Sequence, residues 1–127
     1  MSAAYQLRKL GHASVVFDSH DKLGGMMRYG IPSYRTPDAY LDPEIDRILK
    51  MGNIEVKLNT TIGKDVSAES LEKDYDAVLW AIGCWTGRDL PVPNSDAPNC
   101  ISAIKYLEAF AQKRLHVTAK KVVCVGG

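Results

Sequence analysis

With 127 residues, the chain has room for one domain with a sizeable core but not for two ordinary nucleotide-binding domains. Its composition, 46% hydrophobic and 24% charged with a formal net charge of +1, is that of a globular protein and provides no general positive field for nucleic acid. No apolar run approaches the roughly 20 residues of a membrane span, and no signal-peptide core is present, so we expect a cytoplasmic protein without a membrane contact.

The first predicted elements are a helix and a short strand that ends in an acid. Residues 3–10 are rich in helix formers, and Gly11 supplies a C-terminal stop. The apolar run 15–17 predicts a strand, and Asp18 follows it directly. The second strand of a dinucleotide-binding βαβ unit ends in such a carboxylate, which accepts hydrogen bonds from an adenosine ribose. Asp18 is therefore the candidate ribose ligand.

A pair of glycines follows in a segment that predicts a long loop. Gly24 and Gly25 lack Cβ atoms, so the backbone there can turn sharply and approach a bulky ligand closely. Residues 19–37 contain two prolines and three glycines without sustained periodicity, as functional loops inside compact domains do. Together with Asp18, the glycine pair predicts the rim of a nucleotide site.

The middle of the chain predicts a helix, an edge strand and a shorter helix. Asp42 is a candidate N-cap with Pro43 at the first helical position, and an apolar helical stripe follows. Residues 54–58 alternate between apolar and charged side chains, which predicts an edge strand with one wet face. Ser67 is expected to cap a short helix through Leu71.

Two further strands and a helix are expected in the second half. Residues 76–83 are nearly continuously apolar, which favours a central strand of a parallel sheet. Ser102 is expected to cap a helix. Residues 121–127 predict another buried strand that runs into two glycines. These elements together predict an α/β fold with a three-layer, Rossmann-like parallel sheet.

The remaining reactive and aromatic side chains are interpreted as structural. The three cysteines are too widely spaced for a redox pair or a metal cluster, so we expect reduced thiols and no metal site. The three histidines are scattered near loops, and no ligand or base role is assigned to them. Trp80 and Trp85 could stack on an aromatic ring, but core packing is the favoured interpretation.

Two longer motifs carry a family resemblance. The run Gly-Gly-Met-Met-Arg-Tyr-Gly-Ile-Pro at residues 24–32, preceded by Asp18, resembles the flavin-binding region of the glutamate synthase small-subunit family. The run Tyr-Asp-Ala-Val-Leu-Trp-Ala-Ile-Gly at residues 75–83 does so too, and the likeness extends from Ala3 to Gly127. It implies an incomplete FAD/NAD(P)-binding domain of an FAD-dependent pyridine-nucleotide oxidoreductase.

The resemblance implies a set of cofactor-binding residues and no catalytic residue, because the flavin does the chemistry. Asp18 would hold the adenosine ribose of FAD, although the family usually has the longer glutamate there, and a solvated turn residue is the competing interpretation. Ile62 would offer its backbone to the adenine, with a core position as the competing interpretation. The ribityl and pyrophosphate path would be lined by Gly24, Gly25 and Met26. The residues near the flavin would be Arg28, Gly30, Ile31, Pro32, Ala81 and Gly83. The competing interpretation of Arg28 is an ordinary surface ion pair.

The family pattern also implies that the chain is a fragment. In a complete unit the acid lies about 20 residues beyond the glycine fingerprint, so counting back from Asp18 puts those glycines before Met1. Residues 1–120 are expected to be a partial FAD-binding domain without its first strand and fingerprint. Residues 121–127 would be the first strand of a truncated NADPH-binding domain, with Gly126 and Gly127 in its nucleotide loop.

The parent enzyme would pass electrons from NADPH through FAD to an iron-sulfur centre or a large partner subunit. Two other interpretations stay open: a non-enzymatic remnant or interaction module that binds no nucleotide, and a reductase similar to ferredoxin or adrenodoxin reductases. We expect the isolated chain to be inactive, because a pyrophosphate needs the N–H groups of a glycine loop and a helix N-terminus.

The missing first strand would leave a slot in the sheet between residues 15–17 and 78–80. The apolar residues 122–125 are predicted to fill it, either in their own chain or by exchange into a partner, which would make a homodimer.

Overall fold

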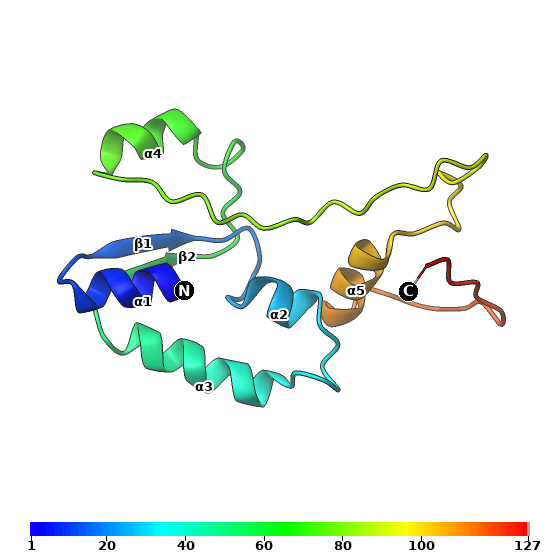
Figure 1. The fold of residues 1–127 in the computed structure, drawn as a ribbon, viewed down its shortest axis with the longest axis horizontal. Helices are drawn as coiled ribbons and strands as arrows, with labels where there is room; N and C mark the ends of the chain where they lie inside the picture. The colour runs from blue at the N-terminus through cyan, green and yellow to red at the C-terminus, as the bar shows by residue number, and fades with distance from the viewer. Residues whose placement is uncertain (127) are drawn as a thin grey trace.

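A computed structural model describes residues 1–126, and Figure 1 shows an open α/β arrangement of helices around a small sheet. In chain order the elements are α1 (Ser2–Lys9), β1 (Ser14–Phe17), α2 (Gly25–Tyr29), α3 (Asp38–Leu49), β2 (Ile54–Lys57), α4 (Ala68–Asp74) and α5 (Ala103–Ala111). The two strands run parallel, because the chain crosses from β1 to β2 through helices. The predicted α/β class with a parallel sheet is confirmed.

The hydrogen bonding between the two strands continues past the carboxyl end of β1. Its register sets Val16 opposite Val56, and β2 alternates between half-buried and exposed residues, as a strand with one wet face does. Beyond β1, the Asp18 N–H donates to the Lys57 carbonyl (3.0 Å), and the Asp18 carbonyl accepts from the Thr60 N–H (2.9 Å). The position of Asp18 is therefore fixed by main-chain bonds.

Local side-chain chemistry explains where three of the helices lie. α1 packs against β1 and buries Ala4. α4 and α5 begin as predicted after serines: the Ser70 N–H donates to Ser67 Oγ (3.1 Å), and the Lys105 N–H donates to Ser102 Oγ (3.4 Å). Each cap satisfies an N–H group that the first turn of a helix leaves unpaired.

α3 begins earlier than the sequence predicts. It starts at Asp38 after Pro37, so Pro43 lies inside the helix, where its missing N–H removes one hydrogen bond. Asp42 is therefore the fifth residue of α3 and not its N-cap, and its carboxylate forms an ion pair with Arg28. The loop predicted for residues 19–37 likewise contains α2.

The central strand predicted at residues 76–83 is absent from the described structure. The segment is extended and passes β1 in Figure 1, but it belongs to no sheet. Leu79, Trp80 and Ile82 are 68%, 48% and 73% exposed, so Trp80 is not in a core. A buried strand needs a hydrogen-bonded neighbour on each side, and residues 1–126 provide none for this segment.

The C-terminal segment is also unpaired. Residues 121–126 form no strand, and Val122, Val123 and Val125 are exposed. The prediction that residues 122–125 pair with 15–17 or 78–80 of the same chain is therefore wrong. Gly127 lies outside the described residues.

The chain exposes far more surface than a closed domain of its size. Its accessible area is 10130 Å², whereas a compact monomer of 14.0 kDa is expected to expose about 6,700 Å². The buried apolar residues are few: Ala4, Leu23, Tyr29, Ile45 and Leu71. The core thus lies beside the two strands and around the loop after β1. Within residues 1–126, the helices lack the length and apolar character needed to cross a bilayer.

Candidate functional site

The acid predicted from the sequence lies at the carboxyl end of β1. Open parallel sheets place their ligands at this edge. Asp18 Oδ1 accepts a hydrogen bond from the His20 N–H (3.0 Å) and lies 3.2 Å from His20 Nδ1. Its side chain is 24% exposed, and Oδ2 makes no hydrogen bond to the described residues. One carboxylate oxygen is therefore held and the other is available.

The two glycines differ in what they do. Gly24 has a φ of +128°, and a Cβ built on it would lie 2.8 Å from Leu41 Cδ2, so a side chain is excluded both by conformation and by packing against α3. Gly25 has a φ of +49°, and its Cβ would meet nothing within 4 Å. Gly24 is explained by the fold, whereas Gly25 presents bare backbone to open space, as a close approach to a ligand requires.

Arg28 acts as a clamp on this loop. Its Nε donates to the Leu23 carbonyl (2.6 Å), one terminal nitrogen lies 2.9 Å from Asp38 Oδ2, and the other pairs with Asp42. Burial lowers the pKa of Arg28, but the hydrogen bond to Asp42 and the charge of Asp38 more than offset this, so its pKa is raised. Arg28 therefore forms ion pairs, but its side chain is buried and not on the surface, as the competing interpretation expected.

A second buried side chain of α2 fixes the loop from its other side. The Tyr29 hydroxyl donates to Asp21 Oδ1 (2.6 Å). This bond lowers the pKa of Asp21. Burial, and then the Asp21 carboxylate, raise the pKa of Tyr29. The loop is therefore anchored by polar contacts to α2 at both of its sides.

No role was predicted for His20, yet it is the centre of the site. Its ring stacks on Tyr29 (centroids 4.2 Å apart, planes at 25°) and lies against Trp85 (4.8 Å, 36°). Its Nε2 is 3.4 Å from Glu108 Oε1 on α5. A local clue existed, because a residue two positions after an aspartate can donate its N–H to that carboxylate. The contacts with Trp85 and Glu108 had no such clue.

The other residues predicted near a flavin lie along α2 and the turn after it. Met26 covers Gly30, whose hypothetical Cβ would lie 1.8 Å from Met26 Sδ, so a side chain at Gly30 would displace that of Met26. The Ile31 N–H donates to the Met26 carbonyl (3.0 Å). Pro32 accepts from the Arg35 N–H (2.8 Å) and begins the turn toward α3.

The remaining predicted residues lie apart from this loop in the chain. Ile62 is half-buried and forms an isolated parallel bridge with Val66. Ala81 and Gly83 are exposed on the extended segment, and Gly83 has a φ of +70° beside the Trp85 indole. Gly126 is exposed with a φ of +93°. Ile62 lies two residues after Thr60, whose N–H donates to the Asp18 carbonyl, and Gly83 lies beside Trp85, which contacts His20.

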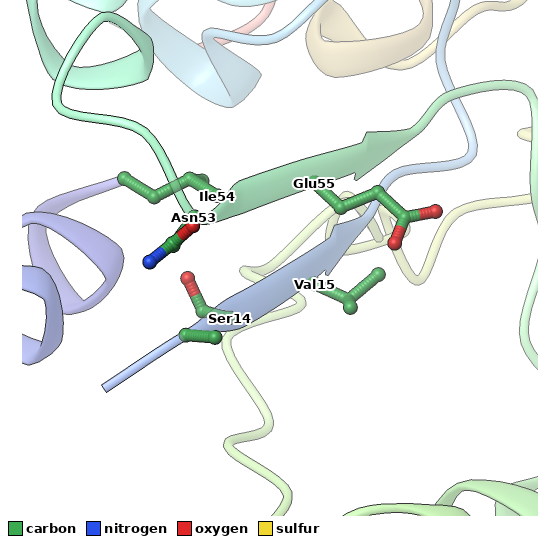
Figure 2. A pocket seen from close by; sticks show the side chains of 6 residues that line it. Ser14, Val15, Asn53, Ile54 and Glu55 are labelled. Carbon is green, nitrogen blue, oxygen red and sulfur yellow. The ribbon is translucent and has the colours of Figure 1, made fainter.

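The hollow in Figure 2 lies at the opposite end of the sheet. It is lined by Ala13, Ser14, Val15, Asn53, Ile54 and Glu55, where β1 and β2 begin. Ligands of parallel sheets bind at the carboxyl ends of the strands, whereas this hollow lies where the strands begin. We therefore place the candidate site at the Asp18 end of the sheet.

Comparison with known proteins agrees with the motifs. Over 140 aligned residues the chain is 33% identical to the glutamate synthase (NADPH) small chain of Mycobacterium tuberculosis, and the alignment covers all of this chain. The chain is a relative of the glutamate synthase small chains. It is also 37% identical over 129 residues to the NADP(+)-dependent formate dehydrogenase subunit beta of Moorella thermoacetica. The predicted family resemblance is confirmed.

The chain corresponds to only part of each relative. The chain spans 28% of the Mycobacterium small chain and 18% of the Moorella subunit. Its fold matches that of a mutant of FprA from Mycobacterium tuberculosis with a TM-score of 0.74 and 19% identity, over 85% of this chain and 25% of FprA. That match supports the Rossmann-like fold. No family model matches the chain.

Proposed function

We propose that residues 1–120 are part of the FAD-binding domain of an NADPH-dependent flavin oxidoreductase, and that residues 121–127 begin its NADPH-binding domain. The observation that carries the proposal is the position of Asp18. It follows β1 at the edge where parallel sheets bind nucleotides, with Oδ2 available for a ribose hydroxyl. Gly25 offers open backbone in the same loop.

The loop after β1 would bind the adenosine diphosphate part of FAD. Asp18 would accept hydrogen bonds from the ribose diol, and Gly24, Gly25 and Met26 would lie along the pyrophosphate and ribityl path. The flavin would approach the turn formed by Gly30, Ile31 and Pro32, while Ile62 would contact the adenine. Ala81 and Gly83 have no side chain larger than a methyl group, so they would allow the cofactor close to the extended segment.

When bound, FAD would take hydride from NADPH and release electrons to a one-electron acceptor. This chain would bind and orient the flavin, while the acceptor would be an iron-sulfur centre or a large partner subunit. The names of the relatives support a subunit role, since one is a small chain and another a subunit beta. The NADPH in the small chain's name supports the choice of reductant.

The proposal is tested by titrating the chain with FAD and measuring the quenching of flavin fluorescence. A hydrogen-bonded carboxylate contributes roughly 1.5–3 kcal/mol, so Asp18→Ala should weaken binding by about tenfold or more. Asp76→Ala is the matched control, because Asp76 is exposed and forms no ion pair within residues 1–126. Equal titrations of parent and Asp18→Ala would show that Asp18 is not the ribose ligand.

A second candidate function is an interaction module that binds no nucleotide. The large exposed surface favours it, because about half as much area again as expected is left uncovered. Flavin absorbance in the purified protein separates the two functions: a yellow preparation supports the cofactor site, and a colourless one that does not take up added FAD supports the module. A reductase of the ferredoxin or adrenodoxin type stays a third prediction, which the likeness to FprA does not decide because it concerns the fold alone.

A further inference from the structure

His20 lies between two carboxylates. Its Nδ1 is 3.2 Å from Asp18 Oδ1, and its Nε2 is 3.4 Å from Glu108 Oε1. A neutral imidazole carries one N–H, so one of the two contacts would set a nitrogen lone pair against a carboxylate oxygen. The imidazolium has an N–H on each nitrogen and a positive charge, so only this form makes both contacts attractive: the Nδ1 contact as a hydrogen bond and the Nε2 contact as an ion pair.

The surroundings of the ring fix its orientation. The His20 side chain is 12% exposed and lies between the Tyr29 and Trp85 rings. Aromatic faces also stabilise a neighbouring cation. Trp85 belongs to the extended segment and Glu108 to α5, so His20 joins the second half of the chain to the loop after β1.

We infer that His20 is a positioning residue: as an imidazolium it bridges Asp18 and Glu108, holds Asp18 by Oδ1 so that Oδ2 stays available, and fastens α5 and Trp85 against the carboxyl end of β1. The bridge itself is a property of the chain without a ligand. That the bridge prepares Asp18 to bind a ribose rests on the proposed function.

The other charged groups around the ring keep their charge where a histidine titrates. Asp21, bound to Tyr29, stays ionised because that hydrogen bond lowers its pKa. The pKa of Tyr29 is raised by burial, so it stays neutral. Arg114, whose terminal nitrogen is 4.0 Å from Glu108 Oε1, stays positive. The protonation of His20 therefore decides whether the bridge forms, because a neutral imidazole can make only one of the two contacts.

The test uses a chain in which His20 is the remaining histidine and Trp85 the remaining tryptophan. The sequence has three histidines and two tryptophans, so a chain with His12→Gln, His116→Gln and Trp80→Phe retains only His20 and Trp85. His12 and His116 are exposed and lie outside the cluster. In this background, acrylamide quenching reports the exposure of Trp85, and ring ¹⁵N shifts in NMR report which nitrogens of His20 carry protons.

We expect Trp85 to be shielded at about pH 5.5, with both ring nitrogens protonated, and to become at least about twofold more accessible at about pH 8, when the bridge is broken. Glu108→Gln, a change on a helix surface, should make Trp85 accessible at both pH values. Glu72→Gln on α4, an exposed carboxylate without an ion pair in the described chain, should behave like the parent.

A Trp85 accessibility that is equal at both pH values, or a Glu108→Gln chain that behaves like the parent, would overturn the bridge. Because no ligand is added, a failure to bind FAD leaves this result unaffected and counts against the proposed function alone. A parent that binds FAD but lacks the pH response would count against the bridge alone.

Discussion

Arg28 of α2 forms an ion pair with Asp42 of α3, and this contact fastens the loop after β1 to the helix that covers it. The Arg28 side chain is 6% exposed, whereas Asp42 is half exposed. The guanidinium also donates to the Leu23 carbonyl, so it satisfies a loop group that would otherwise lack a partner. The site is therefore held in place by a buried cation whose partners reach the solvent.

The first prediction is that Arg28→Met loosens the loop. Losing the hydrogen bonds of a charged group costs about 1.5–3 kcal/mol, so the free energy of unfolding should fall by roughly that amount in urea titrations. Arg47→Met is the matched control, because Arg47 forms an exposed pair with Glu44 and a cation–π contact with the Tyr5 ring, and we expect a loss of no more than about 1 kcal/mol. Equal losses in the two variants would contradict the role of Arg28 as a clamp.

The second prediction concerns acid. The hydrogen bond from Arg28 lowers the pKa of Asp42, and that from Tyr29 lowers the pKa of Asp21. A carboxyl group with a depressed folded pKa contributes stability above its unfolded pKa, near 4, and loses it as the pH falls through the folded value. The Tm should therefore decline below about pH 4. In Arg28→Met, NMR titration should return the pKa of Asp42 toward its ordinary value, and an unchanged pKa would refute Arg28 as the cause of the shift.

The third prediction separates the two loop glycines. Gly24→Ala introduces both a strained φ and a clash with Leu41, so we expect a loss of about 2–4 kcal/mol. Gly25→Ala meets no neighbour and should lose about 1 kcal/mol from its positive φ. In a Leu41→Ala background the difference between the two variants should shrink. Equal losses in the parent background would mean that the packing of Gly24 against α3 is unimportant.

The features that the sequence predicted depend on neighbours close in the chain. Ser67 and Ser102 cap their helices through N–H groups three residues ahead, and Asp18 follows directly from the strand pattern. Local propensity and capping contain that information. They do not contain the ion pair that Asp42, the predicted cap, forms with Arg28.

The features that the sequence missed depend on partners far along the chain. His20 became the centre of the site through Trp85 and Glu108, which no local pattern connects to it. Residues 76–83 have the composition of a buried strand, but composition cannot supply the neighbouring strands that would bury it. The acid of the site was predictable, whereas the side chain that holds it was not.

The last prediction is that two copies of the chain exchange their C-terminal segments. β1 pairs only with β2 among residues 1–126, so its second edge is unpaired, and three exposed valines, Val122, Val123 and Val125, could cover it in a partner. Burying six valines in a two-fold dimer would contribute about 9–18 kcal/mol, against a cost of association of about 4–15 kcal/mol.

The midpoints of these two ranges leave about 4 kcal/mol, so we expect a weak dimer with a Kd on the order of 1 mM, which sedimentation equilibrium over a matching concentration range can detect. Val123→Lys should abolish it, because Val123 is 86% exposed in the single chain and its replacement leaves the monomer intact while burying a charge in the exchanged strand. Val117→Lys, 56% exposed and outside that segment, should leave the dimer unchanged. A chain that stays monomeric over the whole range, or a dimer that Val123→Lys does not weaken, would exclude the exchange.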